Sequence, residues 1–193
     1  MTLSIRDSVR DAYSSAAARP SASHPFPVGR AFAESIGYSA GVLQDFPDDC
    51  VDRFAGVSNI SLTAEMPMGA AVLDLGCGAG LDSMIAGRRI GAKGRVAGVD
   101  FSAAMLERAR RGALQARIQN VVFCRADAER LPLRDASIDV ALVNGIFNLN
   151  PARSCIFHEL ARVVRDEGTV YSAELILSAP LPPAEQNAAN WFA

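Results

Sequence analysis

The chain has 193 residues, half of them hydrophobic, which suffices for one α/β domain that buries roughly 70% of its unfolded surface. Its formal net charge is −2, and 18 arginines and the single lysine, Lys93, are scattered, so no basic run marks a nucleic-acid or acidic-lipid partner. The sequence lacks an apolar run of membrane-spanning length, an N-terminal leader pattern and any metal-ligand cysteine spacing, and we therefore predict a reduced, soluble, cytoplasmic protein.

Residues 1–65 predict a helical cap that contains no strand. An amphipathic helix is expected over residues 3–17, because apolar side chains recur there on one helical face. Two short helices are expected near residues 39–46 and 47–55, the second with Pro47 in its first turn. The apolar face of the first helix comprises Ile5, Val9, Ala12, Tyr13 and Ala16.

Residues 66–193 predict a second unit, in which apolar strands alternate with helices. That alternation indicates an α/β fold with a doubly wound, mostly parallel sheet covered on both faces. Ligands of such sheets bind at the carboxyl ends of the strands, where the strand order reverses. The expected strands are 71–76, 95–100, 121–127, 138–144 and 169–177, and the helices between them are 81–90, 102–117 and 152–164.

A glycine loop, "DLGCGAG", follows the first expected strand. Glycine allows a sharp turn and lets a ligand lie directly on the backbone. The spacing of Gly76, Gly78 and Gly80 is GxGxG, whereas a dinucleotide site favours GxGxxG. Asp74 at the lip of the loop suits a ligand that carries a cation or an amino group better than one that carries phosphates.

Two further strands end in carboxylates. Asp100 stands where an acid can accept hydrogen bonds from both ribose hydroxyls of a nucleoside, and Phe101 is placed to lie on a purine. Asp127 follows the third strand and suits an exocyclic amine, with Ala126 and Ala128 leaving room beside it. Each acid alone could be a helix cap or a turn former. Together they predict one pocket at the strand ends.

These segments resemble the motifs of class I S-adenosylmethionine-dependent methyltransferases, with their Rossmann-like fold. The motifs are "VLDLGCGAG", "VAGVDFSAAMLERAR", "FCRADAERLPL" and "VNGIFNLNP…HELARVV", within residues 60–178. "VRDAY", "GYSAGVLQDFP" and "FAGVSN" are similar to the arsenite methyltransferase-like branch, in which the matching tyrosine and asparagine lie over the methionine end of the cofactor. The implied S-adenosylmethionine site comprises Tyr13, Asn59, Asp74, Gly76, Cys77, Gly78, Gly80, Asp82, Asp100, Phe101, Ala126, Asp127, Ala128 and Asn144.

The cysteines depart from the arsenite branch. That branch has a cysteine directly after the fourth-strand asparagine, where this chain has Gly145, and its paired early cysteines are missing here. Trivalent arsenic requires converging thiolates. Cys50 is the one thiol in the cap, and Cys77, Cys124 and Cys155 are expected to be small core residues. Arsenite therefore becomes the alternative acceptor, and the leading prediction is a small molecule that accepts the methyl group in line.

The catalytic and acceptor residues stay open at this level. His24 is expected at the surface and His158 on a solvated helix face, so neither is assigned as a base, and no metal site is predicted. A non-catalytic cofactor-binding or assembly subunit is a further alternative, and a nicotinamide-dependent reductase fits the glycine spacing less well. The cap aromatics, which either line an acceptor pocket or form a small core, are Phe26, Phe32, Tyr38 and Phe54.

The resemblance also implies two more strands, a hairpin after a fifth helix. The chain ends about where that helix would begin, so we expect a truncated chain or a sheet edge completed by a second copy or a partner subunit. Trp191 and Phe192 are the candidate contact residues at this C-terminal edge.

Overall fold

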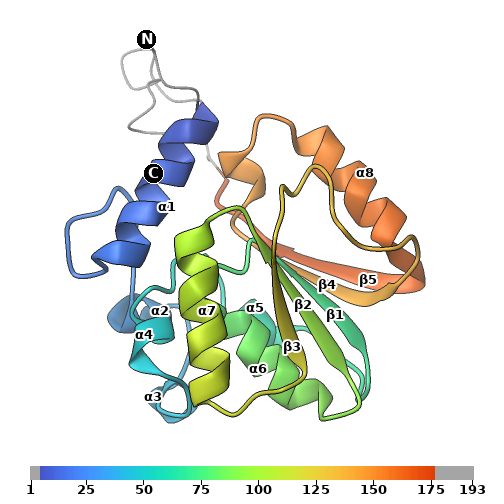
Figure 1. Ribbon diagram of the computed structural model, residues 1–193, viewed down its shortest axis with the longest axis horizontal. Coiled ribbons are helices and arrows are strands. Elements are labelled where there is room, and N and C mark those ends of the chain that lie inside the picture. The colour runs from blue at the N-terminus through green and yellow to red at the C-terminus, as the bar shows by residue number, and fades with distance from the viewer. Residues whose placement is uncertain (1–4, 177–193) are drawn as a thin grey trace.

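A computed structural model describes residues 5–176, and its centre is a sheet of five parallel strands (Figure 1). The strand order is β3-β2-β1-β4-β5, so the order reverses between β1 and β4. This confirms the doubly wound α/β fold and locates its switch point at the tips of those two strands. The strands are β1 (Ala71–Leu75), β2 (Arg95–Asp100), β3 (Val121–Arg125), β4 (Ile138–Asn144) and β5 (Val164–Ala173).

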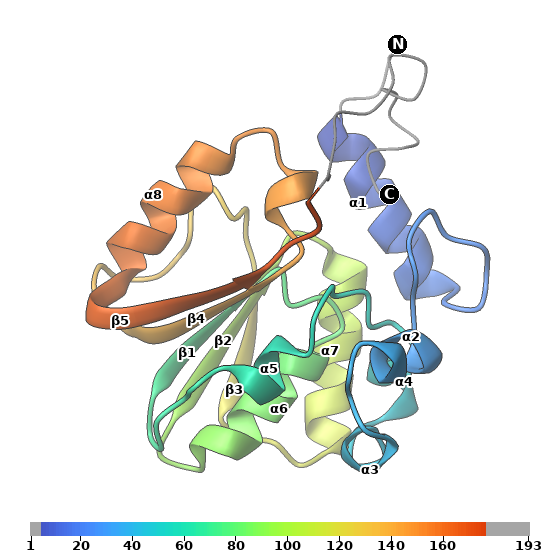
Figure 2. The same ribbon diagram turned by 180° about the vertical axis from the view of Figure 1, so that it is seen from behind.

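Helices cover both faces of the sheet because the strand residues alternate between two cores (Figure 2). Val72 and Val140 pack with residues of α5 and α6 on one face. Leu73 and Ala141, their neighbours along the strands, pack with α8 on the other face. The helices are α5 (Ile60–Thr63), α6 (Leu81–Ile90), α7 (Ala103–Gln115), which contacts β3, and α8 (Arg153–Val163).

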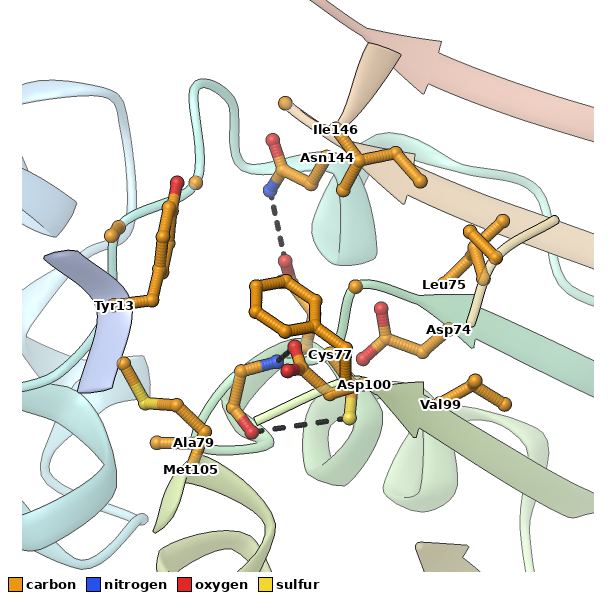
Figure 3. A pocket seen from close by; sticks show the side chains of 18 of the residues that line it. Tyr13, Asp74, Leu75, Cys77, Ala79, Val99, Asp100, Met105, Asn144 and Ile146 are labelled. Carbon is orange, nitrogen blue, oxygen red and sulfur yellow. Dashed lines mark hydrogen bonds between the residues drawn. The ribbon is translucent and has the colours of Figure 1, made fainter. Parts of the chain in front are cut away.

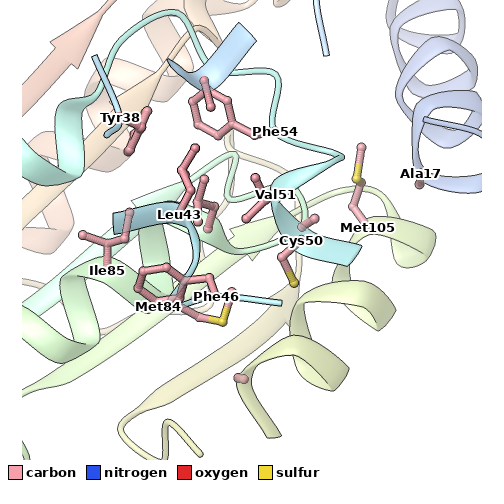
Figure 4. Packing of buried hydrophobic residues seen from close by; sticks show 14 of the residues in the cluster. Ala17, Tyr38, Leu43, Phe46, Cys50, Val51, Phe54, Met84, Ile85 and Met105 are labelled. Atoms are coloured by element: carbon pink, nitrogen blue, oxygen red, sulfur yellow. The ribbon is translucent and has the colours of Figure 1, made fainter. Parts of the chain in front are cut away.

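The N-terminal helices form a cap at the α6 and α7 side of the sheet (Figure 4). Leu43, Phe46 and Val51 of the cap are buried against Met84 of α6 and Met105 of α7. The cap therefore has a core of its own that continues into the sheet layer. Its helices are α1 (Ile5–Ala18), α2 (Arg30–Ser35), α3 (Ala40–Leu43) and α4 (Asp48–Val51).

Several elements differ from the expectations. Helices α2 and α5 were not predicted, and α3 and α4 are shorter than the segments 39–46 and 47–55. Strand β5 begins directly after α8, because its register jumps from Val164 opposite Ile138 to Thr169 opposite Val140. The "RDEG" turn, residues 165–168, is the irregular part of β5 between these two paired positions, and Glu167 in it has a φ of 66°.

The prediction that Cys124 and Cys155 are core residues is wrong, since both are exposed. Strand β3 pairs only with β2 in the described sheet, and Val122, on the same face as Cys124, is 69% exposed. The helices that mainly contact β3, α6 and α7, pack on its other face, that of Phe123. In α8, Ile156 and Leu160 take the buried side, which leaves Cys155 on the outer side.

Among residues 5–176 no helix is both long and apolar enough to cross a membrane. Trp191 and Phe192, the contact residues expected at the C-terminal edge, lie outside the described residues. Association through that edge therefore stays a prediction.

Candidate functional site

A cavity of about 1140 Å³, counting the part open to solvent, lies between the strand tips and the cap. All the residues implied in the cofactor site line it except Asn59 (Figure 3). The Asn59 side chain is not part of the cavity lining and donates to the Gly37 carbonyl at 3.2 Å, so its contact with the cofactor stays a prediction. The other residues meet because parallel strands bring their carboxyl ends to one edge.

The glycine loop bends through three left-handed residues, with φ values of 78° at Gly76, 51° at Gly78 and 84° at Gly80. A Cβ on Gly80 would stand 2.9 Å from the Cβ of Ala109 in α7, so this glycine permits close packing. A Cβ on Gly78 would meet nothing within 4 Å. Gly78 lines the cavity, and its bare backbone leaves a cradle for a ligand.

Three buried carboxylates dominate the electrostatics of the cavity, since Asp74 is 2%, Asp82 6% and Asp100 8% exposed. Burial, followed by the neighbouring charge of Asp82, raises the pKa of Asp74 to about 8. Burial also raises the pKa of Asp82 and that of Asp100. Among the side chains that the structure describes, those of residues 8, 9 and 11–176, no basic one donates a hydrogen bond to these carboxylates. The cavity is therefore suited to a ligand that brings positive charge.

Arg53 is the basic side chain among the described residues that line the cavity, and its donors point elsewhere. Its Nε donates to the Ala17 carbonyl at 2.6 Å, and its Nη1 pairs with Asp49 Oδ1 at 2.6 Å. These bonds tie α1 to α4. Arg53 thus supports the cap and leaves the carboxylates uncompensated.

Asp100 retains capacity for a ligand. Its Oδ2 accepts from Gly78 N at 2.9 Å and its Oδ1 from Ser102 N at 2.7 Å. A carboxylate has about four acceptor positions, so two are left for a diol. The N-cap of α7 is Ser102, which accepts from Met105 N, and the reading of Asp100 as a cap is wrong. Phe101, Ala126, Asp127 and Ala128 line the cavity beside it.

Asn144 at the tip of β4 lines the cavity, but its amide is fully engaged with the protein. Its Oδ1 accepts from Val57 N at 2.9 Å and Ser58 N at 3.1 Å. Its Nδ2 donates to Ser58 O at 2.8 Å and to Asp82 Oδ2 at 2.9 Å. An amide offers two acceptor and two donor positions, so none is left for a ligand.

Asp82, at the start of α6, receives donors from three elements. Besides Asn144, the hydroxyls of Tyr38 and Ser61 both donate to its Oδ1. Tyr38 follows α2 and Ser61 lies in α5. The carboxylate therefore joins the cap, α5 and β4 at one buried point.

The segment after β4 is held by Glu174, a residue that the sequence motifs missed. Glu174 Oε1 accepts from Ile146 N at 3.0 Å and from Phe147 N at 2.9 Å, at the start of the 3-10 helix Phe147–Leu149. Glu174 follows β5 directly, so the rule that identified the acids at the ends of β1 and β2 could have found it. Asn148 donates to Leu175 O, and Asn150, which also lines the cavity, donates to Glu129 Oε1.

Tyr13 of α1 closes the cavity opposite the strand tips (Figure 3). Its ring stacks on Phe26, with 4.5 Å between centroids. Burial, then the charges of Asp100 and Glu174, raise the pKa of its phenol. Its hydroxyl makes no hydrogen bond to the side chains of residues 8, 9 and 11–176, which the structure describes. Tyr13 thus offers the cavity a neutral phenol.

Neither the two cavity thiols nor the histidines supply a reactive group to the site. Cys50 and Cys77 line the cavity, and burial raises the pKa of Cys50 to about 12 and also raises that of Cys77. Both are therefore protonated at neutral pH. Neither histidine lines the cavity; His24 contacts Arg19 O and His158 contacts Ser154 O. Among residues 5–176, no three His, Cys, Asp or Glu side chains are placed to hold a metal.

Comparisons with known proteins agree on one family. The model of a methyltransferase domain matches residues 68–192. An arsenite methyltransferase of Halobacterium salinarum is 34% identical over 150 residues, which are 78% of this chain and 38% of that protein. A demethylmenaquinone methyltransferase of Lactococcus lactis is 31% identical over 106 residues, 55% of this chain and 42% of that protein. The chain thus spans less than half the length of these relatives.

Solved structures show the same fold. The crystal structure of an arsenic(III) S-adenosylmethionine methyltransferase from Chlamydomonas reinhardtii has a TM-score of 0.62 and 26% identity, covering 86% of this chain and 57% of that one. A SAM-dependent methyltransferase from Aquifex aeolicus has a TM-score of 0.55 at 23% identity, covering 64% of this chain and 67% of that one, and supports the fold alone.

Proposed function

Because this chain belongs to the class I S-adenosylmethionine-dependent methyltransferases, related to the arsenite methyltransferase branch, we propose that it binds S-adenosylmethionine and transfers its methyl group to a small organic acceptor. The single observation that carries the proposal is the cavity, in which a left-handed glycine loop and three buried, uncompensated carboxylates meet at the switch point of the sheet. Such a site complements a cationic nucleoside.

The described residues fit this cofactor. Asp100 has two acceptor positions for the ribose, Gly78 leaves its cradle open, and Asp74 supplies a buried carboxyl to the cationic methionine end. Bound S-adenosylmethionine supplies an activated methyl on its sulfonium. The protein then needs chiefly to orient the acceptor and to exclude water.

The cap side of the cavity supports a neutral, largely apolar acceptor. Val9 and Phe54 line the cavity there, Ile146 and Leu149 add apolar lining from the segment after β4, and the nearby cation Arg53 is engaged with Asp49. An anionic acceptor would meet carboxylates without a compensating base. Of the four cap aromatics that were expected to line an acceptor pocket or form a small core, Phe54 lines the cavity. The other three pack in the cap core: Phe26, Phe32 and Tyr38.

Arsenite stays the alternative acceptor, since relatives bear that name. The thiol geometry argues against it. Cys50 Sγ lies 3.7 Å from Arg108 O and Cys77 Sγ lies 3.9 Å from Gly78 O. The two thiols therefore contact different backbone carbonyls and do not point at a common position. At Gly145, where the branch carries a cysteine, there is no side chain.

Isothermal titration with S-adenosylmethionine tests the cofactor site. We expect Asp100→Ala to reduce affinity by at least 100-fold, because hydrogen bonds to charged groups contribute about 1.5–3 kcal/mol each. Asp139→Ala is the matched control. Asp139 also accepts a hydrogen bond from a backbone N–H, that of Ala71, but it lies at the amino end of β4, on the edge of the sheet opposite the cavity. Unchanged affinity in Asp100→Ala would refute the ribose assignment.

The acceptor is tested with a panel of neutral, anionic and cationic small molecules plus arsenite, read out by formation of S-adenosylhomocysteine. Turnover with a neutral apolar member supports the proposal. Binding of the cofactor without methyl transfer to any member would favour the non-catalytic subunit instead.

A further inference from the structure

The strap, residues 54–58 between α4 and α5, forms part of the cavity wall without belonging to a helix or strand. Phe54, Ala55 and Gly56 line the cavity. The next two residues, Val57 and Ser58, give both their N–H groups to Asn144, and Ser58 O accepts from the same amide. The Asn144 side chain thus holds the C-terminal end of the strap by three hydrogen bonds.

The strap also fits closely against Asn144. A Cβ on Gly56 would lie 2.4 Å from Asn144 Nδ2, so only glycine leaves room for the amide there. On the opposite side, Asn144 Nδ2 donates to Asp82, which the hydroxyls of Tyr38 and Ser61 hold in place.

We propose that Asp82 and Asn144 form a latch that positions the strap over the cavity, and that they control cofactor affinity through the strap rather than by bonding the cofactor themselves. This revises the sequence expectation that both residues bind the cofactor. Asn144 has no hydrogen-bonding position left, and Asp82 already accepts from three side chains. The inference rests on the proposed cofactor site.

The two residues act as one unit because Asp82 orients the amide of Asn144. With Asp82 in place, the amide nitrogen faces the carboxylate and the Ser58 carbonyl, so the amide oxygen faces the strap N–H groups. An asparagine at position 82 has a single acceptor oxygen. Its N–H₂ group would therefore replace one of the two oxygens that now accept from Asn144 or from the Tyr38 and Ser61 hydroxyls. Asp82→Asn therefore disturbs the same bonds that Asn144→Ala deletes, and their effects are expected to be non-additive.

The test measures two quantities on the full chain: amide hydrogen exchange of Val57 and Ser58 by NMR, and the Kd of S-adenosylmethionine by calorimetry. Asn144→Ala is expected to accelerate exchange of both amides and to raise the Kd, each at least tenfold. Asp82→Asn is expected to shift both in the same direction. The double variant is expected to match Asn144→Ala within about twofold.

Asn120→Ala is the matched control. Asn120 Nδ2 donates to Gly87 O at 2.8 Å and Gly91 O at 3.0 Å, so this variant also deletes a partly buried amide with two bonds, far from the strap. It should lower the melting temperature while changing strap exchange and Kd by less than twofold.

Three results would overturn the latch: unchanged exchange in Asn144→Ala, faster exchange with unchanged Kd, or additive effects in the double variant. Failure of the proposed function is distinguishable. If the unaltered chain binds no S-adenosylmethionine, the cofactor site and its coupling to the strap both fail, whereas the exchange rates still decide whether Asn144 holds the strap.

Discussion

The three loop glycines share a left-handed backbone but differ in surroundings, and this difference predicts how each tolerates alanine. A non-glycine residue in this conformation costs roughly 1–2 kcal/mol. Gly80 adds a steric cost, because its Cβ would lie 2.9 Å from Ala109 Cβ and 2.9 Å from Phe123 Cζ. Forcing an atom into such a packed contact costs roughly 1–3 kcal/mol more. Gly80→Ala should therefore destabilise the fold by about 2–5 kcal/mol in total.

Gly69 supplies the reference. Its φ of 83° matches that of Gly80, and nothing lies within 4 Å of its Cβ position, so Gly69→Ala should cost only the backbone term, about 1–2 kcal/mol. Gly78→Ala should be similarly mild for stability. Its methyl would enter the open cradle, however, and should weaken S-adenosylmethionine binding at least tenfold, or about 1.4 kcal/mol.

Urea unfolding followed by circular dichroism measures the stabilities, and calorimetry measures the cofactor affinities. At this chain length each kcal/mol corresponds to roughly 2–4 °C in melting temperature, so a thermal scan provides an independent check. If Gly80→Ala loses no more stability than Gly69→Ala, to within about 0.5 kcal/mol, the assignment of Gly80 to close helix–strand packing is wrong.

Three further outcomes follow from the site. The pKa of Asp74 is raised from 3.8 to about 8, so between these pH values the folded state holds a proton that the unfolded state has lost. The free energy of unfolding should therefore fall as the pH rises through this window, by up to about 1.4 kcal/mol per pH unit. Urea titrations of Asp74→Asn should show a smaller decrease of stability with pH. Gly145→Cys should not by itself create arsenite-dependent consumption of S-adenosylmethionine, and activity there would revive the arsenic site. A thiol reagent should label Cys124 and Cys155 rapidly in the folded chain and the other two thiols only on unfolding, as mass spectrometry of peptides can show.

The sheet was predictable because its elements are locally marked. Strands 95–100 and 138–144 and helix 81–90 match the expected bounds, since each is an apolar run or helical stripe that ends at glycine or a polar residue. Helix α2 escaped prediction, as it has only six residues and no side-chain cap bond. The start of β5 at Val164 was not predicted because "RDEG" indicates a turn, whereas pairing with β4 at Val164 and again from Thr169 makes these residues part of the strand.

The site was predictable in part for the same reason. Asp74 and Asp100 lie at the carboxyl ends of β1 and β2, Asp127 follows β3, and parallel topology alone brings such residues to one cavity. The placement of Asn59 was not predictable, because a side chain at a helix N-terminus can turn toward either neighbour and here contacts Gly37. Glu174 follows the same strand-end rule, but the expected strand ran to residue 177 whereas β5 ends at Ala173, so Glu174 was placed inside the strand.

The sequence by itself determined the order of strands and helices, the glycine loop and the acids at the strand ends, because periodicity, backbone freedom and charge are properties of neighbouring residues. Only the tertiary structure decided how those polar groups divide between ligand and protein. Asn144 reads as a strand-end amide that faces a ligand, yet its four hydrogen-bonding positions are taken by residues from 57 to 82. Hydrogen-bond saturation depends on partners distant in the chain, so no local pattern reveals it.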